Sequence, residues 1–115
     1  MALDIVKTAN TILALENFLA KRRPPEHLRD QIDLNYKIED QSIILFEERP
    51  HWQKPGVTIE SKIAKAAWVK ARQCWKIYWL RADLKWHSYQ PAAEVQTIEE
   101  FLKVVDEDSH GCFWG

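Results

Sequence analysis

The chain is poor in the residues that mark several common functional classes. Only three of its 115 residues are glycine, and a phosphate-binding loop needs several glycines at close spacing, so nucleotide binding by that route is excluded. The two cysteines, Cys74 and Cys112, offer one pair at most. The N-terminal residues show no pattern of a secretion signal. We therefore expect a reducing, cytoplasmic setting rather than an exported protein stabilised by disulfides.

Neither an excess of one charge nor a long hydrophobic run is present. Sixteen lysine and arginine residues stand against 17 acidic ones, so no overall positive field exists to attract nucleic acid or an anionic membrane, and such binding would need a local patch. The longest apolar runs have only four residues, as at residues 43–46, and are far shorter than the roughly 20 residues that cross a bilayer. We expect a soluble protein without a membrane partner, folded as one domain over residues 1–115.

A long helix is predicted over about residues 2–23. Its apolar residues recur at steps of three and four, which gathers them on one side of a helix. They are Ile5, Val6, Ala9, Ile12, Leu13 and Leu19. The Pro-Pro pair at residues 24–25 ends the helix, because proline lacks the N–H that the helical ladder needs. Glu16 falls inside the apolar arc, so the sequence predicts a partner for its carboxylate, with Arg49 and Arg81 as candidates.

Alternation of apolar and polar residues indicates an antiparallel sheet after this helix. Residues 32–38 alternate with period two, residues 39–42 favour a turn, and residues 43–49 are interpreted as the partner strand of a hairpin. Residues 51–57 contain a Pro-Gly pair, and they predict a loop because these two residues favour turns and disfavour a sheet ladder.

The second half of the chain is predicted to continue the sheet as a Trp-rich meander. Residues 59–71 have mixed helix and strand propensity. We interpret them as a strand, because the alternating segment at residues 75–80 needs a paired neighbour. A turn at residues 81–83 leads into a further strand over residues 84–89.

A capping box begins the last predicted element. Thr97 and Glu100 have the spacing at which a threonine hydroxyl and a glutamate carboxylate satisfy free N–H groups at a helix start, so a short helix is predicted over about residues 97–106. Residues 111–115 follow as a tail. The predicted fold class is α+β, with a long N-terminal helix, an antiparallel meander of four or five strands across residues 31–89, and a short C-terminal helix.

Three segments carry a family resemblance. Residues 75–89 contain Trp-Lys-Ile-Tyr-Trp followed by Lys-Trp-His-Ser-Tyr, residues 46–52 contain Arg-Pro-His-Trp, and residues 111–115 read Gly-Cys-Phe-Trp-Gly. On these motifs the chain, from about Ile32 onward, resembles a family of small bacterial proteins catalogued as a domain of unknown function. The resemblance implies the general layout, a bacterial origin and a cytoplasmic setting. It implies no activity.

The first candidate site is the aromatic and basic hairpin within residues 75–89. The predicted binding residues are Lys76, Tyr78, Arg81, Lys85, His87 and Tyr89. Strict alternation places all of these except Arg81 on one face, with Trp75, Trp79 and Trp86 on the other. Rings flanked by cations suit single-stranded nucleic acid, because bases stack on rings while phosphates meet lysine and arginine. The alternative is that the rings form the core, and the near-neutral net charge favours that interpretation.

A second candidate is a set of carboxylates: Glu16 on the helix, Glu47 or Glu48 on the second strand, and Glu60 with Lys62 on the third. An acid followed by Glu-x-Lys is similar to the metal site of restriction-endonuclease-like nucleases, where carboxylates hold Mg²⁺ and a lysine stabilises charge on the phosphate. Glu60 and Lys62 face the same way on a strand. An upstream aspartate is not evident, so Glu16, Glu48, Glu60 and Lys62 stand as an alternative catalytic set.

A zinc site would have to combine His110 and Cys112 with His87 and Cys74. Their spacing matches no standard zinc pattern, and a cysteine packed as a small hydrophobic residue is the simpler interpretation. The sequence therefore predicts neither a bound metal nor a cofactor.

Taken together, the sequence features predict a non-catalytic binding module that contacts an unidentified protein partner through aromatic anchors. Binding of single-stranded nucleic acid through the hairpin is the first alternative, and a Mg²⁺-dependent nuclease using Glu60 and Lys62 is the second. The chain is expected to be a monomer or a homodimer, the latter through an exposed strand edge.

Overall fold

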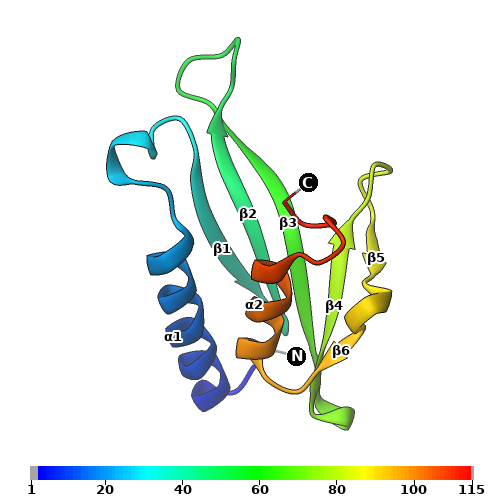
Figure 1. The fold of residues 1–115 in the computed structure, drawn as a ribbon. Coiled ribbons are helices and arrows are strands. Elements are labelled where there is room, and N and C mark those ends of the chain that lie inside the picture. Colours follow the sequence, from blue (N-terminus) through cyan, green and yellow to red (C-terminus); the bar gives the residue numbers. More distant parts are fainter. Residues whose placement is uncertain (1–2, 115) are drawn as a thin grey trace.

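A computed structural model describes residues 3–114, in which two helices lie on one face of a six-stranded antiparallel sheet (Figure 1). The helices are α1 (Ile5–Arg22) and α2 (Ile98–Glu107), and the strands are β1 (Asp33–Glu39), β2 (Ser42–Pro50), β3 (Thr58–Val69), β4 (Cys74–Leu80), β5 (Trp86–Ser88) and β6 (Glu94–Val95). Strands β1 to β5 follow one another in sheet order, and β6 pairs with β4. The predicted α+β class and meander are confirmed, with β6 as an addition.

Helix α1 is confirmed, but it begins at Ile5, three residues later than predicted, and ends one residue earlier, at Arg22. Ala2 lies outside the described residues. The side chain of Asp4 accepts a hydrogen bond from the N–H of Lys7 and caps the first turn, and the helix ends at Arg22, before the two prolines. The predicted buried face is wrong. Thr11, Leu15 and Leu19 are buried, whereas most of the predicted apolar arc faces solvent. Its exposed members are Ile5, Val6, Ala9, Ile12 and Leu13.

This error has a physical cause. The helix carries two apolar arcs, and helical spacing gives no information on which of them meets the sheet. Residues 11, 15 and 19 recur every four positions and form one row, flanked by the half-buried Ala14 and Phe18. That row packs against the sheet and α2, and the second arc faces solvent.

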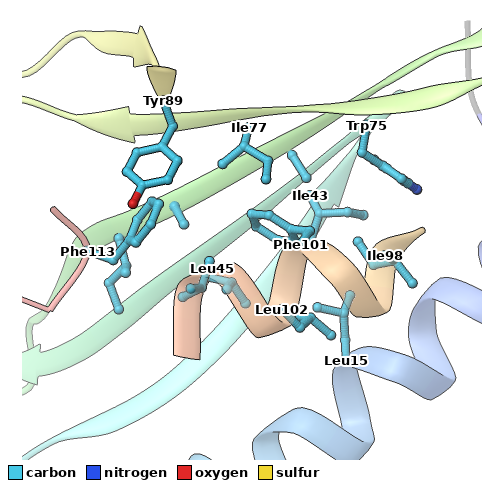
Figure 2. Packing of buried hydrophobic residues seen from close by; sticks show 14 of the residues in the cluster. Leu15, Ile43, Leu45, Trp75, Ile77, Tyr89, Ile98, Phe101, Leu102 and Phe113 are labelled. Atoms are coloured by element: carbon cyan, nitrogen blue, oxygen red, sulfur yellow. The ribbon is translucent and has the colours of Figure 1, made fainter. Parts of the chain in front are cut away.

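The core fills the space between the helices and the sheet. Trp75 and Phe101 are the largest fully buried side chains, and Figure 2 shows Phe101 of α2 among Ile43, Ile77 and Leu102. Since side chains alternate across a strand, the inward residues of β2 are 43 and 45, while 44 and 46 point to the opposite face. The core interpretation is confirmed for Trp75, while Trp79 is only partly buried against the core and Trp86 is not part of it.

Strand β3 is long and continuous, which confirms the strand interpretation of residues 59–71 up to Val69. The last residues of that prediction form a 3₁₀ turn, Lys70–Arg72. A bulge interrupts the β2–β3 register, because Leu45 pairs with Ala64 and Phe46 with Lys62. Ile63 is thus an extra residue, and such a residue bends and twists its strand.

The C-terminal residues are packed against the core and do not form the free tail that the sequence suggested. Phe113 is buried, and its ring lies 4.9 Å from that of Tyr89. Asp108 accepts hydrogen bonds from the N–H groups of Phe113 (3.1 Å) and Trp114 (2.9 Å). Gly115 lies outside the described residues. Over residues 3–114, neither helix combines the length and hydrophobicity that a membrane-spanning helix needs.

Candidate binding groove at the open face of the sheet

The sheet face opposite the two helices, here called the open face, is covered by no helix within residues 3–114 (Figure 1). Ile44 and Phe46 are nevertheless 5 % exposed there. The ammonium group of Lys37 lies 5.4 Å from the centre of the Phe46 ring and also pairs with Glu60 at 3.0 Å. Long lysine side chains therefore shield this face with their alkyl stems and keep their charges at the surface.

The predicted binding hairpin is divided between the two faces. Tyr78 pairs with Ser88 and Leu80 with Trp86, whereas Trp79 pairs with His87. The even-numbered residues of β4 and β5 thus share the open face, and the odd-numbered ones face the helices. Lys76, Tyr78 and Trp86 lie on the open face, while His87 and Tyr89 join Trp75 and Trp79 on the other. The predicted common face for Lys76, Tyr78, Lys85, His87 and Tyr89 is therefore wrong.

The residues on the helix side are occupied by packing and turn contacts. Tyr89 is 3 % exposed, and burial raises the pKa of its hydroxyl. His87 lies 2.9 Å from the carboxylate of Asp83, and the guanidinium of Arg81 lies 5.5 Å from the ring of Trp79. Of the six predicted binding residues, Lys76, Tyr78 and Lys85 remain available on or beside the open face.

A groove opens where β3 and β4 part. Pairing between these strands starts at Ala64 and Trp79 and runs toward Val69 and Cys74. Within the described chain, residues Thr58 to Lys62 pair with β2 only, and all five are exposed. Figure 1 shows the two strands diverging toward the 51–57 loop. The second edge of this half of β3 therefore presents unpaired backbone N–H and C=O groups.

The space beside that edge has a volume of about 620 Å³. We call it the β3–β5 groove, and it is lined by Ile59, Glu60, Ser61, Lys62, Leu80, Leu84, Lys85 and Trp86. Apolar side chains come from both walls, and the Trp86 ring is half-buried. This combination of an unpaired strand edge with apolar contacts is what strand addition by an extended peptide requires.

The groove is positively biased. Glu60, its one acidic residue, is neutralised by Lys37, and this hydrogen bond is the main cause that raises the pKa of Lys37. Lys62 and Lys85 form no ion pair with any residue between 3 and 114. Their charges are therefore free to attract acidic groups.

Among the residues that line the groove, Leu84 has no packing role within residues 3–114 that would account for a leucine at its position. It lies in the hairpin turn, is 79 % exposed, and has a φ of 62°. This left-handed conformation costs a leucine roughly 1 kcal/mol, and the exposed side chain gains no burial in return. In the sequence, the signal for this residue is a leucine directly after the Arg-Ala-Asp turn residues.

The carboxylates of the nuclease alternative are only partly brought together. Glu48 and Glu60 are cross-strand partners, and Lys62 lies two residues further along the same face. Glu16, however, lies on α1 at the other face, where it is exposed and accepts a hydrogen bond from Tyr36. Glu48 accepts one from the Asn35 amide at 3.0 Å. No group of three His, Cys, Asp or Glu residues within residues 3–114 is arranged to hold a metal ion.

The cysteines are both free thiols. Cys74 is buried, with its sulfur 3.7 Å from a carboxylate oxygen of Glu94, and Cys112 is half-buried. Burial raises the pKa of the Cys112 thiol, which disfavours the thiolate that a nucleophile or a zinc ligand needs. Their environment is that of packing residues.

Fold and site together define an α+β protein in which two helices cover one face of an antiparallel meander and a groove opens at its other face. The chain belongs to a family defined by a domain of unknown function, DUF3024, whose model matches residues 4–115. This match confirms that the chain belongs to a family of unknown function, as the resemblance implied. No curated protein and no solved structure matches the chain.

Proposed function

We propose that the protein is a non-catalytic binding module that takes up an extended peptide segment of a partner protein in the β3–β5 groove. The observation that carries the proposal is the unpaired, exposed edge of residues Thr58 to Lys62 beside Trp86. A peptide strand added at this edge would gain main-chain hydrogen bonds, and its alternate side chains would meet the groove walls.

The lining indicates the chemistry of the peptide. Ile59, Leu80 and Leu84 provide apolar contacts, while Lys62 and Lys85 carry charges without an acidic partner among the described residues. We therefore propose a segment in which β-branched or aromatic residues alternate with acidic ones. The free Cys74 and Cys112 thiols support the cytoplasm as its setting, because thiols stay reduced there.

The experiment is selection from a displayed library of random peptides against the folded protein. The proposal predicts enrichment of acidic sequences rich in valine, isoleucine and aromatic residues. Trp86→Ala should weaken the selected peptide by roughly tenfold or more, as loss of a central aromatic contact does. Trp52→Ala is the matched control, because Trp52 is 81 % exposed and lies outside the groove. Peptides that bind equally well to both variants would refute the proposal.

Single-stranded nucleic acid is the second candidate, favoured by one feature of the open face. The ammonium group of Lys65 lies 5.6 Å from the ring of Tyr78 and 6.0 Å from that of Trp86, so a cation stands beside two rings on which bases could stack. Anisotropy of a labelled oligonucleotide across a salt series tests it. Phosphate contacts predict an affinity that falls steeply with salt and falls further in Lys65→Gln. An affinity independent of salt excludes this candidate.

A further inference from the structure

Helix α1 exposes an apolar stripe that neither the core nor the β3–β5 groove uses. The stripe consists of Ile5, Val6, Ala9, Ile12 and Leu13. Ile5 is 88 % exposed, Val6 70 %, Leu13 62 % and Ile12 38 %. Together these side chains present roughly 500 Å² of apolar surface, which is at the upper end of the largest patches on ordinary monomeric proteins. The largest apolar patch of a monomer is often functional, and this one spans roughly two and a half turns of helix.

The charge pattern around the stripe decides what can cover it. Between residues 5 and 13 no charged residue lies on this side of the helix, and the exposed polar residues beside the stripe, Asn10 and Asn17, are neutral. Glu16 lies in the same arc, one turn beyond the stripe. The carboxylate of Glu16, at the C-terminal end, is already engaged by the hydroxyl of Tyr36. A neutral stripe offers no charge by which to select a partner of complementary sign, and it offers no like charge to repel a second copy of itself.

We propose that α1 packs antiparallel on α1 of a second copy of this chain, across a two-fold axis close to Ala9. This arrangement is isologous, so each stripe is covered by an identical one. A small residue at the centre lets two helices approach to roughly 8 Å. The antiparallel direction also pairs the helix dipoles favourably.

Distances along the helix keep the Glu16 carboxylates of the two copies apart. Glu16 lies seven positions from Ala9, so two such carboxylates would be roughly 21 Å apart along the paired helices at 1.5 Å per residue. Their repulsion is screened, because the Debye length is roughly 8 Å at physiological ionic strength. Two stripes bury roughly 1,000 Å² in total, the lower limit for a specific interface, so the dimer forms in a concentration-dependent way.

Sedimentation velocity over a protein concentration series tests the dimer. The wild-type chain should shift from monomer to dimer as the concentration rises, and Leu13→Glu should remain monomeric with an unchanged far-UV spectrum. Leu84→Glu is the matched control, because Leu84 is also an exposed leucine but lies in the groove; it should dimerise normally and lose peptide binding instead. A wild-type chain that stays monomeric, or a Leu13→Glu variant that still dimerises, overturns the proposal.

A cross-linking experiment locates the axis. In a Cys112→Ser background, Ala9→Cys should form a disulfide-linked dimer when treated with oxidised glutathione, because the two residues at position 9 face each other. Ala20→Cys, on the same helix and also exposed, should not, since the two residues at position 20 would be roughly 33 Å apart along the helices. Equal cross-linking at both positions would contradict the antiparallel arrangement.

Discussion

The hydroxyl of Tyr36 donates a hydrogen bond of 2.8 Å to Oε1 of Glu16 and so joins α1 to the outer strand β1. The sequence predicted an arginine partner for Glu16, and this is wrong. Arg49 pairs with Glu47 at 3.5 Å, and Arg81 lies beside Trp79. A phenol suffices because Glu16 is exposed on the helix, so its charge remains hydrated and needs no buried counter-ion.

Burial, followed by the hydrogen bond and charge of Glu16, raises the pKa of Tyr36 from 10.0 to about 12. The folded pKa is above the unfolded one, so this contribution to stability is complete below pH 10.0 and is lost as the pH rises toward about 12. A near-UV absorbance titration should therefore show a late tyrosine ionisation that Tyr36→Phe removes. If Tyr36→Phe instead removes an ionisation near pH 10.0, the contact is not formed.

The bidentate pair of Arg23 and Asp33 predicts loss of stability in acid. Nε and Nη2 of Arg23 lie 2.7 and 2.6 Å from the two carboxylate oxygens, and this hydrogen bonding is the main cause that lowers the pKa of Asp33 below 3.8. The stabilisation is present above pH 3.8 and is lost as the pH falls through the lower folded value.

Asp33→Asn should therefore lower the free energy of unfolding by about 1 kcal/mol at neutral pH, a modest figure because Arg23 is partly exposed. The difference from wild type should shrink as the pH falls below 3.8. Urea denaturation across pH measures it, with Asp30→Asn as control, since Asp30 forms no ion pair with the described residues. A deficit that persists unchanged in acid would contradict the assignment.

The order of helices and strands could be predicted from local patterns, whereas the distribution of residues over the two faces of the β4–β5 hairpin could not. Alternation in β1 and β4, the apolar run of β2 after a turn, and the capping box at Thr97 are local signals, and each produced the predicted element. Which residues of β4 and β5 share a face depends on the pairing of Leu80 with Trp86 across the turn. A shift of one residue in that turn exchanges the two faces, so alternation alone could not assign them.

The groove and the packed C-terminus depend on contacts between distant parts of the chain. The groove exists because β3 continues beyond the residues that β4 pairs, and strand length is not encoded by periodicity. The burial of Phe113 depends on Tyr89, which is distant in sequence, and on Asp108. Asp108 is close in sequence, but its role depends on the backbone geometry at the end of α2. The predicted buried face of α1 likewise omitted Leu15 and Phe18, because helical spacing does not show which of two apolar arcs contacts the sheet.

Asp108 is predicted to hold the C-terminus on the core. It ends α2 with a φ of 41° and accepts hydrogen bonds from two backbone N–H groups. Asp108→Ala should lower the free energy of unfolding by about 2 kcal/mol, because two donors lose a partner and alanine tolerates this backbone poorly. Asp108→Asn should cost less, since it keeps one acceptor and tolerates positive φ. Equal stability of both variants and wild type in urea denaturation would refute this role.

Leu84 is predicted to lower the stability of the folded protein. Leu84→Gly removes the strain of a positive φ and loses no buried surface, so it should raise the free energy of unfolding by about 0.5 kcal/mol after the entropy cost of glycine. Ala82→Gly, at an exposed turn position without a positive φ, should lower it instead. Thermal denaturation compares the two. If Leu84→Gly destabilises the protein as Ala82→Gly does, the leucine is structural.

The central claim is that an extended peptide pairs with the free edge of β3, and an NMR titration of the ¹⁵N-labelled protein with a peptide from the selection tests it most directly. The account predicts that the largest shifts occur at the backbone amides of residues 59–62 and at the Trp86 indole. A version of the peptide with prolines at alternate positions cannot pair as a strand and should not produce them. Shifts centred elsewhere, or unchanged with the proline peptide, would contradict strand addition.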